Sequence, residues 1–413
     1  AHHPDGAGSR ISVVSIGLPY PATGASRVVF NSYMKALCAA GLRVSHVILA
    51  DPGKISAAEQ AAYFSDIGAP VNSDIAIIDA VPVMTATRWT LKRHSNLQQA
   101  TEALRSQSPD AVICFDIDAA MVAAPLSRPR KLVWIGDLHY QTIWYHFLYS
   151  VRENLRNLVS SLWILRRIRL WQQIYRETLH GFDDIIVCAY RSVADFRKIG
   201  LQARFAPYPW PASAVAPVVD RSVIQKPSFI FFGRLGGLGS RSSFHFLLEQ
   251  LYPQLLANWG SQGFVLDICG LDQLPNWVEA LLADKLEIRF LGFVPDLEAQ
   301  MRAYHAMVVP IDAPVGNRTR ILTAMANGLP VVAHTHVALG NPSLVDGVTC
   351  RLATEAKGFA AALRWCYEQS AEAAALARRA RQSWQDEYSP DVAAGLFATA
   401  VDTALNQTQE HRP

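Results

Sequence analysis

Two arginines stand at the start of a predicted helix, where positive charge is unfavourable. From Pro310 the chain reads PIDAPVGNRTRILTAMANGLPVVA, which is an apolar strand, a loop with Gly316, and a helix from near Arg318 to Asn327. Arg318 and Arg320 fall in the first turn, at the positive end of the helix dipole. Helix stability therefore does not explain them. A bound anion does, because helix amino termini bind phosphate groups, and the pattern predicts a site for a diphosphate.

A second loop offers a glycine and an arginine to the same kind of ligand. From Phe231 the chain reads FFGRLGGLGSR. Gly233 lets the backbone turn close to a ligand, and the Arg234 guanidinium has the planar fork that grips a phosphate through two parallel hydrogen bonds. The loop predicts a second phosphate contact at the end of an apolar strand.

The elements that position these loops are alternating strands and helices. Short apolar runs begin at Ile11, Val44, Ile75, Asp110, Lys131 and Asp184, and again at Ser228, Phe264, Leu286, Ala306 and Pro330. Helical patterns separate them, and such alternation forms parallel sheets covered on both faces. The proline-rich break PYPWPASAVAPVV, from Pro207, cannot sustain a helix or a central strand. We predict an α/β fold of two Rossmann-like, doubly wound domains whose strand ends face a ligand-binding cleft.

The proline-rich break also sets the expected domain boundaries. Residues 1–9 are expected to be a tail outside the fold. Residues 10–212 form the predicted N-terminal domain, and residues 213–388 form the predicted C-terminal domain. Residues 389–413 form a helix and tail, with a return to the N-terminal domain as one alternative.

Composition excludes several classes of protein. The net charge is only +3, which excludes a dedicated nucleic-acid binder, and half of the residues are apolar, which excludes wholesale disorder. The cysteines are spread singly with no C-x-x-C pair, which argues against a disulfide framework and a zinc site. No apolar run approaches the roughly 20 residues that cross a bilayer. We expect a cytoplasmic protein, with peripheral attachment to the inner face of the plasma membrane as an alternative.

The stretch from Gly316 to Ala333 resembles the donor-site signature of GT-B glycosyltransferases, especially the bacterial family-4-like group. The common form is G-T-R-x-K-x-x-E-A-M-A-x-G-x-P-V-V-A. The matching residues are Gly316, Arg318, Ala324, Met325, Ala326, Gly328, Pro330, Val331, Val332 and Ala333. Arg320 stands where the family usually has Lys, which preserves the charge. Thr323 stands where the family usually has the Glu that hydrogen-bonds the nucleotide ribose, so ribose recognition and activity stay open.

Three further stretches of the C-terminal half resemble the same family in order. The loop at Gly233 is similar to a G-R-L segment that is followed by a Lys, although Gly239 stands at that position and Arg241 is the nearest substitute. SFHFLLEQLYPQL, from Ser243, resembles the helix that follows. LEIRFLGFVPDL, from Leu286, resembles the G-F-V-x-D turn, which usually contacts the base.

The resemblance also implies that the N-terminal domain binds the acceptor, that the C-terminal domain binds the nucleotide-sugar donor, and that a set of residues contacts the donor. GLPYPATGASR, from Gly17, is similar to the family's first Pro- and Gly-rich loop, which faces the acceptor and closes over the donor. The implied donor-binding residues are Gly24, Gly233, Arg241, Phe293, Val294, Gly316, Asn317, Arg318, Thr319 and Thr323.

The resemblance implies transfer of a hexose-type sugar from a nucleoside diphosphate sugar to an acceptor hydroxyl, with retention. The acceptor is a glycan, a lipid-linked molecule or another compound. Arg234 and Arg320 are the main candidates to stabilise the departing diphosphate. GT-B enzymes generally need no metal, and the D-x-D pair Asp116 and Asp118 lies in the acceptor half, so no metal or other cofactor is expected. Two other classes stay open, a GT-B-like sugar-nucleotide epimerase and a non-catalytic scaffold that binds a nucleotide or a partner.

Two polar residues follow a strand of the N-terminal half. WIGDLHYQ, from Trp134, places Asp137 and His139 just beyond the strand end, where catalytic acceptor-side residues are expected. A helix cap for Asp137 and a partly buried polar side chain for His139 are equally open interpretations.

The stretch from Val151 to His180 is both basic and apolar. On a single straight helix its arginines occupy about half of the circumference. These are Arg152, Arg156, Arg166, Arg167, Arg169 and Arg176. Arginines mixed with Trp and Leu suit docking at an anionic membrane surface, which we keep as a hypothesis. An ordinary domain helix with one buried stripe is the slightly favoured alternative.

Overall fold

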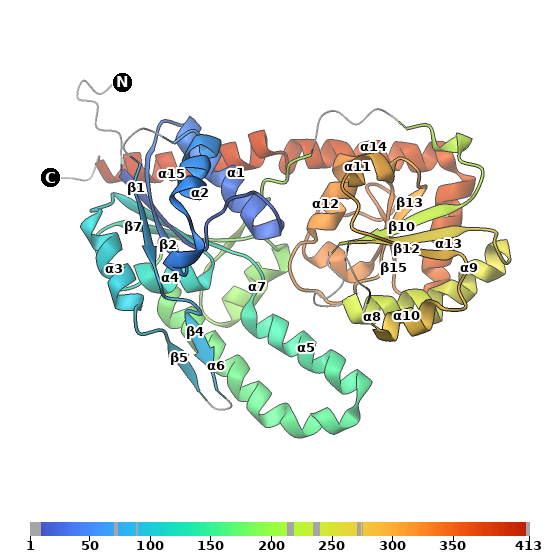
Figure 1. Cartoon of the computed structure of the whole chain (residues 1–413), viewed down its shortest axis with the longest axis horizontal. Coiled ribbons are helices and arrows are strands. Elements are labelled where there is room, and N and C mark those ends of the chain that lie inside the picture. Colours follow the sequence, from blue (N-terminus) through green and yellow to red (C-terminus); the bar gives the residue numbers. More distant parts are fainter. Residues whose placement is uncertain are drawn as a thin grey trace. The chain divides into compact units, whose positions relative to one another are not determined.

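The computed structural model describes residues 10–69, 73–87, 90–212, 219–233, 240–270, 274 and 276–409, without the side chains at 240, 241, 404 and 406–409. The chain forms two compact units (Figure 1). Unit 1 comprises Ala1–Phe147, Asn154–Pro211 and Ser389–Pro413. Unit 2 comprises Leu148–Glu153 and Ala212–Tyr388.

Unit 1 contains a parallel sheet in the order β3-β2-β1-β6-β7-β8-β9. Its central strands are almost wholly buried, as expected for a parallel sheet covered on both faces. The strands are β1 (Arg10–Ile16), β2 (Arg43–Leu49), β3 (Ile75–Ile78), β6 (Ala111–Phe115), β7 (Arg130–Ile135), β8 (Asp184–Val187) and β9 (Arg204–Phe205). A separate antiparallel pair is formed by β4 (Met84–Ala86) and β5 (Leu91–Arg93).

The helices of unit 1 pack their apolar faces on this sheet and on one another. They are α1 (Ala25–Ala39), α2 (Ala57–Ile67), α3 (Leu97–Ser106), α4 (Ile117–Ala123), α5 (His139–Glu153), α6 (Ser161–Leu179), α7 (Tyr190–Lys198) and α15 (Pro390–Gln409). The end of α5 belongs to unit 2. The last helix, α15, lies against α1, where the rings of Phe397 and Tyr33 are 4.3 Å apart. Pro390 starts α15 at the position where a missing backbone N–H costs no intrahelical hydrogen bond.

Unit 2 contains a second parallel sheet in the order β12-β11-β10-β13-β14-β15, with helices on both faces (Figure 1). The strands are β10 (Ser228–Phe232), β11 (Val265–Cys269), β12 (Ile288–Gly292), β13 (Ala306–Val309), β14 (Val331–His334) and β15 (Arg351–Ala353). The helices are α8 (Ser240–His245), α9 (Tyr252–Trp259), α10 (Asn276–Leu282), α11 (Leu297–Met301), α12 (Thr319–Ala326), α13 (Ala356–Glu368) and α14 (Ser370–Glu387), with a π-helical turn at Phe246–Leu251. The predicted pair of Rossmann-like sheets is confirmed.

The stretch from Val151 to His180 is not the single straight helix on which its arginines were placed, so that interpretation was wrong. Helix α5 ends at Glu153, and the backbone of Asn154 is extended. The Asn154 side chain accepts a hydrogen bond from the Arg156 N–H at 3.0 Å. A 3₁₀ segment, Leu155–Ser160, follows before α6 begins. Asparagine side chains compete with helical hydrogen bonds in this way, so the break has a local cause. The arginines of this stretch consequently do not share one continuous helical face.

One histidine of unit 1 lies in the core. His46 on β2 is 1% exposed. Its Nε2 is 2.8 Å from the Ser15 hydroxyl, and its Nδ1 is 3.1 Å from the Tyr63 hydroxyl. Burial lowers the pKa of His46 to about 3, because the charged imidazolium loses its hydration.

The free energy of unfolding is expected to fall as the pH drops below about 6.5, the usual histidine pKa. In the unfolded chain His46 then binds a proton, whereas in the folded protein it stays neutral until the pH nears 3. Between these two values this single group lowers the stability by up to about 1.4 kcal/mol per pH unit. Urea unfolding from neutral pH to about pH 5 measures the slope.

A matched pair of variants isolates this histidine. His46→Gln should flatten the pH dependence of stability, whereas the same change at the exposed His180 should leave it as in the parent protein. Equal slopes for the parent and both variants would show that His46 does not titrate differently in the folded and unfolded states.

Candidate functional site

Arg320 is a half-buried cation at the start of α12. Its guanidinium carbon lies 5.3 Å from the centroid of the Phe231 ring on β10. Its Nη1 is buried and has no hydrogen-bond partner within the part of the chain that the structure describes. An unsatisfied buried donor of this kind is costly unless a ligand completes it.

The electrostatics of Arg320 also favour an anion. Burial and, to a smaller degree, the positive charge of Arg318 together lower the pKa of Arg320 to about 9. Arg320 thus remains a cation at neutral pH, but its surroundings destabilise the charged form. Arg318, the residue that precedes α12, donates from Nη2 to the carbonyl oxygen of Ala313 at 3.0 Å. Arg318 therefore braces the loop, whereas Arg320 is the cation that still requires a counter-charge.

Two glycines bring strand ends close to Arg320. Gly233 follows β10 with φ +126°, and Gly270 follows β11 with φ +123°. A Cβ at Gly233 would lie 2.8 Å from the Arg320 guanidinium carbon, and a Cβ at Gly270 would lie 2.2 Å from the Gly233 carbonyl oxygen. The left-handed backbone and the close approach both require glycine. The carboxyl ends of β10 and β11 therefore meet the start of α12 at one place.

The loop between β13 and α12 is fixed by contacts of its backbone and side chains. Gly316 has φ +71°, and its carbonyl oxygen would lie 2.1 Å from a Cβ at Gly340. The Asn317 amide donates to the Tyr388 hydroxyl at 3.5 Å. Thr319 is the first residue of α12, as predicted from the helix pattern. The amino terminus of α12 is thus held at the carboxyl edge of the sheet.

The position that departs from the family signature is engaged within its own helix. The Thr323 hydroxyl donates to the Thr319 carbonyl oxygen at 3.1 Å. The Asn327 amide in turn donates to the Thr323 carbonyl oxygen at 2.9 Å. A threonine hydroxyl held in this way does not replace the reach or the charge of a glutamate.

Phe293 and Val294 follow the edge strand β12. Phe293 is 68% exposed, and Val294 is half-buried. Asp296 accepts a hydrogen bond from the Ala299 N–H at 2.9 Å and so caps α11 just behind them. An exposed aromatic ring on a fixed turn has the character of a stacking surface for a flat ligand. Their role in binding the base stays a prediction.

Two arginines of the predicted donor site have side chains outside the described part of the structure. Arg234 lies outside the described residues, as does Gly239. Arg241 lies in α8, and its side chain is not described.

The predicted residues of unit 1 occupy two places. Gly24 precedes α1 with φ +80°. Asp137 is exposed, and His139 is the first residue of α5. The His139 ring stacks on Trp171 at 4.4 Å, and its Nδ1 lies 3.0 Å from the Tyr175 hydroxyl. His139 is therefore firmly oriented by two residues of α6.

Sequence reasoning missed an acidic pair beside His139. Asp116 has φ +77°, and burial raises its pKa to about 6, helped by the charge of Asp137. Burial also raises the pKa of Asp118, against the influence of His139. The Asp118 Oδ1 is buried without a hydrogen-bond partner among the residues described. The D-x-D spacing after a strand was the available signal, but it was weighed only as a metal motif.

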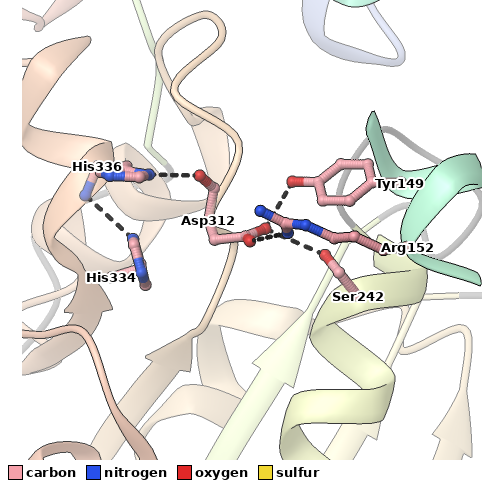
Figure 2. Close-up of polar contacts among 6 residues, drawn as sticks. All are labelled: Tyr149, Arg152, Ser242, Asp312, His334 and His336. Carbon is pink, nitrogen blue, oxygen red and sulfur yellow. Dashed lines mark hydrogen bonds and ion pairs between the residues drawn. The ribbon is translucent and has the colours of Figure 1, made fainter. Parts of the chain in front are cut away.

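A second feature that sequence reasoning missed centres on Asp312, just after β13 (Figure 2). Its Oδ1 accepts hydrogen bonds from the Tyr149 hydroxyl at 2.5 Å and from Ser242 at 3.2 Å. Its Oδ2 pairs with Arg152 at 2.8 Å. Burial alone would raise the pKa of Asp312, but the hydrogen bonds from Tyr149 and Arg152 outweigh burial and hold the pKa below its usual value.

Asp312 also borders a cavity of unit 2 of about 640 Å³. The Asp312 backbone carbonyl oxygen lies 2.6 Å from the ring Nδ1 of His336. The backbone N–H of His336 donates to Nδ1 of His334 (Figure 2). The cavity is lined by Tyr149, Arg152, Glu153, Ser242, His245, Phe246, Gln250, Pro310, Asp312, His334, Thr354 and Glu355. Its lining mixes both signs of charge and indicates no single ligand.

Two family comparisons cover the two halves of the chain. Residues 23–209 match the family described as glycosyl transferase 4-like domain. Residues 226–369 match the family described as glycosyl transferases group 1. The chain belongs to the GT-B glycosyltransferases.

Solved structures of other proteins agree with the fold of this glycosyltransferase. Sucrose-phosphate synthase from Thermosynechococcus elongatus is 16% identical with a TM-score of 0.66, covering 97% of this chain and 100% of its own. Anabaena HepE in complex with UDP and glucose is 16% identical with a TM-score of 0.65, covering 95% and 99%. WaaG, a glycosyltransferase involved in lipopolysaccharide biosynthesis, is 16% identical with a TM-score of 0.59, covering 94% and 98%. No curated protein matches this glycosyltransferase in sequence.

Within the described ranges, no three His, Cys, Asp or Glu side chains gather so that they could hold a metal ion. In the same ranges no helix has the length and hydropathy to cross a membrane.

Proposed function

We propose that this glycosyltransferase moves a hexose from a nucleoside diphosphate sugar to an acceptor hydroxyl, with retention and without a bound metal. The observation that carries the proposal is Arg320, whose buried Nη1 has no hydrogen-bond partner among the described residues. It lies against Gly233 at the start of α12. A diphosphate would supply the missing counter-charge at a helix amino terminus. The UDP in the Anabaena HepE structure is a ligand of this kind.

The proposed chemistry stabilises a departing diphosphate. The bond between the anomeric carbon and the diphosphate oxygen breaks, and a bond from that carbon to the acceptor oxygen forms on the same face. The acceptor proton passes to the leaving phosphate, so no separate base is needed. Arg320 and the first N–H groups of α12 would meet the charge that grows on the diphosphate, and preorganised donors of this kind supply much of an enzyme's rate enhancement.

We assign the acceptor side to the cluster in unit 1. His139 is fixed through Nδ1 by the Tyr175 hydroxyl, which leaves Nε2 for a ligand. The buried Asp118 Oδ1 has no partner within the described chain and would accept a hydrogen bond from an acceptor or sugar hydroxyl. Burial raises the pKa of Asp118, because the charged carboxylate loses its hydration. Asp137, which is exposed, would make a peripheral contact.

A nucleoside diphosphate is expected to stabilise the protein in the absence of metal. The reason is that Arg320 supplies a positive charge for the diphosphate, so the proposal requires no metal ion. At about 100 times the dissociation constant the free energy of unfolding should rise by about 2.7 kcal/mol. Thermal shift with UDP, GDP, ADP and their sugars, each with a chelator, measures the effect and identifies the base.

The corresponding nucleosides are the matched controls, because they carry the base and ribose without the diphosphate. Equal stabilisation by nucleoside and nucleoside diphosphate would contradict the role given to Arg320. Stabilisation that disappears with a chelator would contradict the metal-independent mechanism.

A non-catalytic nucleotide-binding protein is the second candidate, and one observation favours it. The Thr323 hydroxyl is bonded to Thr319, so the carboxylate that usually binds ribose has no equivalent at this position. Hydrolysis of a stabilising nucleotide sugar, or its transfer to any acceptor, would exclude this candidate. Tight binding with neither reaction across a broad acceptor panel would support it.

A further inference from the structure

An exposed apolar patch lies where α5 is joined to α6. Five large apolar side chains between residues 155 and 165 face solvent. Their exposed fractions are 72% for Leu155, 51% for Leu158, 90% for Val159, 78% for Leu162 and 42% for Leu165. All five belong to unit 1 and lie on the 3₁₀ segment and the first turns of α6. We call these five residues the apolar patch.

The apolar patch is not the core-facing side of α6. That helix buries Ile164, Trp171, Tyr175 and Leu179. The chain joining α5 to α6 lies away from the sheet of unit 1 (Figure 1). Packing within unit 1 therefore does not require these side chains, and exposed apolar residues gathered in one short segment are typical of an interaction surface.

The charged side chains of residues 154–176 all have one sign. Arg156, Arg166 and Arg169 are exposed beside it, and Arg167 lies over the Trp163 ring. Residues 154–176 contain no aspartate or glutamate. Protein interfaces are usually rich in aromatic residues, whereas this patch consists only of leucine and valine. Leucines bordered by arginines match a lipid surface, in which anionic headgroups cover apolar acyl chains.

We propose that the apolar patch docks this protein on the surface of a bilayer that contains anionic lipid. The leucines and Val159 enter the boundary between headgroups and acyl chains, and the neighbouring arginines meet lipid phosphates. The patch is short and begins just after the bend at Asn154, so it lies at the level of the headgroups and does not cross the bilayer. This binding does not depend on the proposed sugar transfer.

Vesicle flotation without nucleotide tests the proposal. Vesicles of phosphatidylcholine with about 30% phosphatidylglycerol should bind the protein at least about tenfold more tightly than phosphatidylcholine alone, and salt should weaken the binding. Val159→Ser combined with Leu162→Ser should weaken it about tenfold, because the inserted apolar area is lost. Arg156→Glu combined with Arg169→Glu should remove the preference for anionic vesicles.

Matched variants separate the patch from general surface effects. Leu396→Ser removes a leucine of α15 that is 66% exposed. Arg43→Glu combined with Arg128→Glu makes the same change of net charge at exposed positions outside the patch. Both should bind vesicles like the parent protein. All of these positions are exposed, so the melting temperature should remain close to that of the parent.

Three results would overturn the proposal. One is equal binding to neutral and anionic vesicles, or no binding to either. Another is loss of binding in the control variants to the same degree. The third is a self-association that Val159→Ser with Leu162→Ser abolishes, which would assign the patch to a second copy of the chain. Failure of sugar transfer would bear on none of these, because the flotation assay contains no nucleotide or acceptor.

Discussion

Arg320→Ala should lower sugar transfer about a hundredfold, with little change in the melting temperature. The Arg320 guanidinium reaches the end of β10 and has an Nη1 without a partner in the described chain. If it meets the departing diphosphate, its charge matters more in the transition state than in the ground state. Loss of such a contact costs about 3 kcal/mol, and it should appear in both kcat and kcat/KM.

The effect on stability is expected to be small because two contributions oppose each other. Alanine removes the contact of the guanidinium with Phe231, which is worth about 1 kcal/mol. It also removes a half-buried cation whose pKa is lowered to about 9 by burial and by Arg318, and so relieves an unfavourable charge. The melting temperature therefore separates a loss of chemistry from a loss of folding.

Arg320→Lys is the matched variant. It retains a positive charge, and related enzymes usually carry lysine at this position, so it should keep much of the activity. A folded Arg320→Ala protein that transfers sugar at the parent rate would remove Arg320 from the mechanism. Equal losses in the alanine and lysine variants would show that the planar guanidinium, and not the charge, is what matters.

The fold was predictable because its sequence signals are local. Each long buried strand is a mostly apolar run, such as ISVVSI in β1 and SFIFF in β10. The predicted start of α12 near Arg318 and its end before Gly328 also agree with the structure. The strands β9 and β15 were missed because they have only 2 and 3 residues and no apolar run. Their position comes from pairing with β8 and β14, which is tertiary information.

The site was only partly predictable for the same reason. Residue types and spacing predicted Arg320 and Gly233 as candidate site residues, but not that the guanidinium lies against the glycine. The neighbourhood of His139 and Asp118 depends on how β6 and β7 pair, so no local pattern encodes it. The bend at Asn154 depends on one side-chain hydrogen bond, which a helical wheel does not contain. Burial and partners arise from packing, and they distinguish a functional polar residue from a merely exposed one.

Gly233→Ala should lower sugar transfer roughly tenfold or more by displacing Arg320. The added Cβ would lie 2.8 Å from the Arg320 guanidinium carbon, which is closer than two such atoms can approach. The flexible guanidinium is the group that must move, and a displacement of about 1 Å at a catalytic group can cost about a hundredfold. The left-handed φ of +126° adds backbone strain, expected at about 1–3 kcal/mol of stability.

A double-mutant cycle distinguishes displacement of Arg320 from strain. In the Arg320→Ala background the Gly233→Ala change should cost stability as before but have little further effect on turnover, because the group that it displaces is gone. Gly260→Ala is the control for strain, since Gly260 has φ +74° at the end of α9 and open space where its Cβ would be. It should lower the melting temperature without lowering turnover. Fully additive losses of activity in the Gly233→Ala and Arg320→Ala cycle would show that the glycine serves the reaction independently of Arg320.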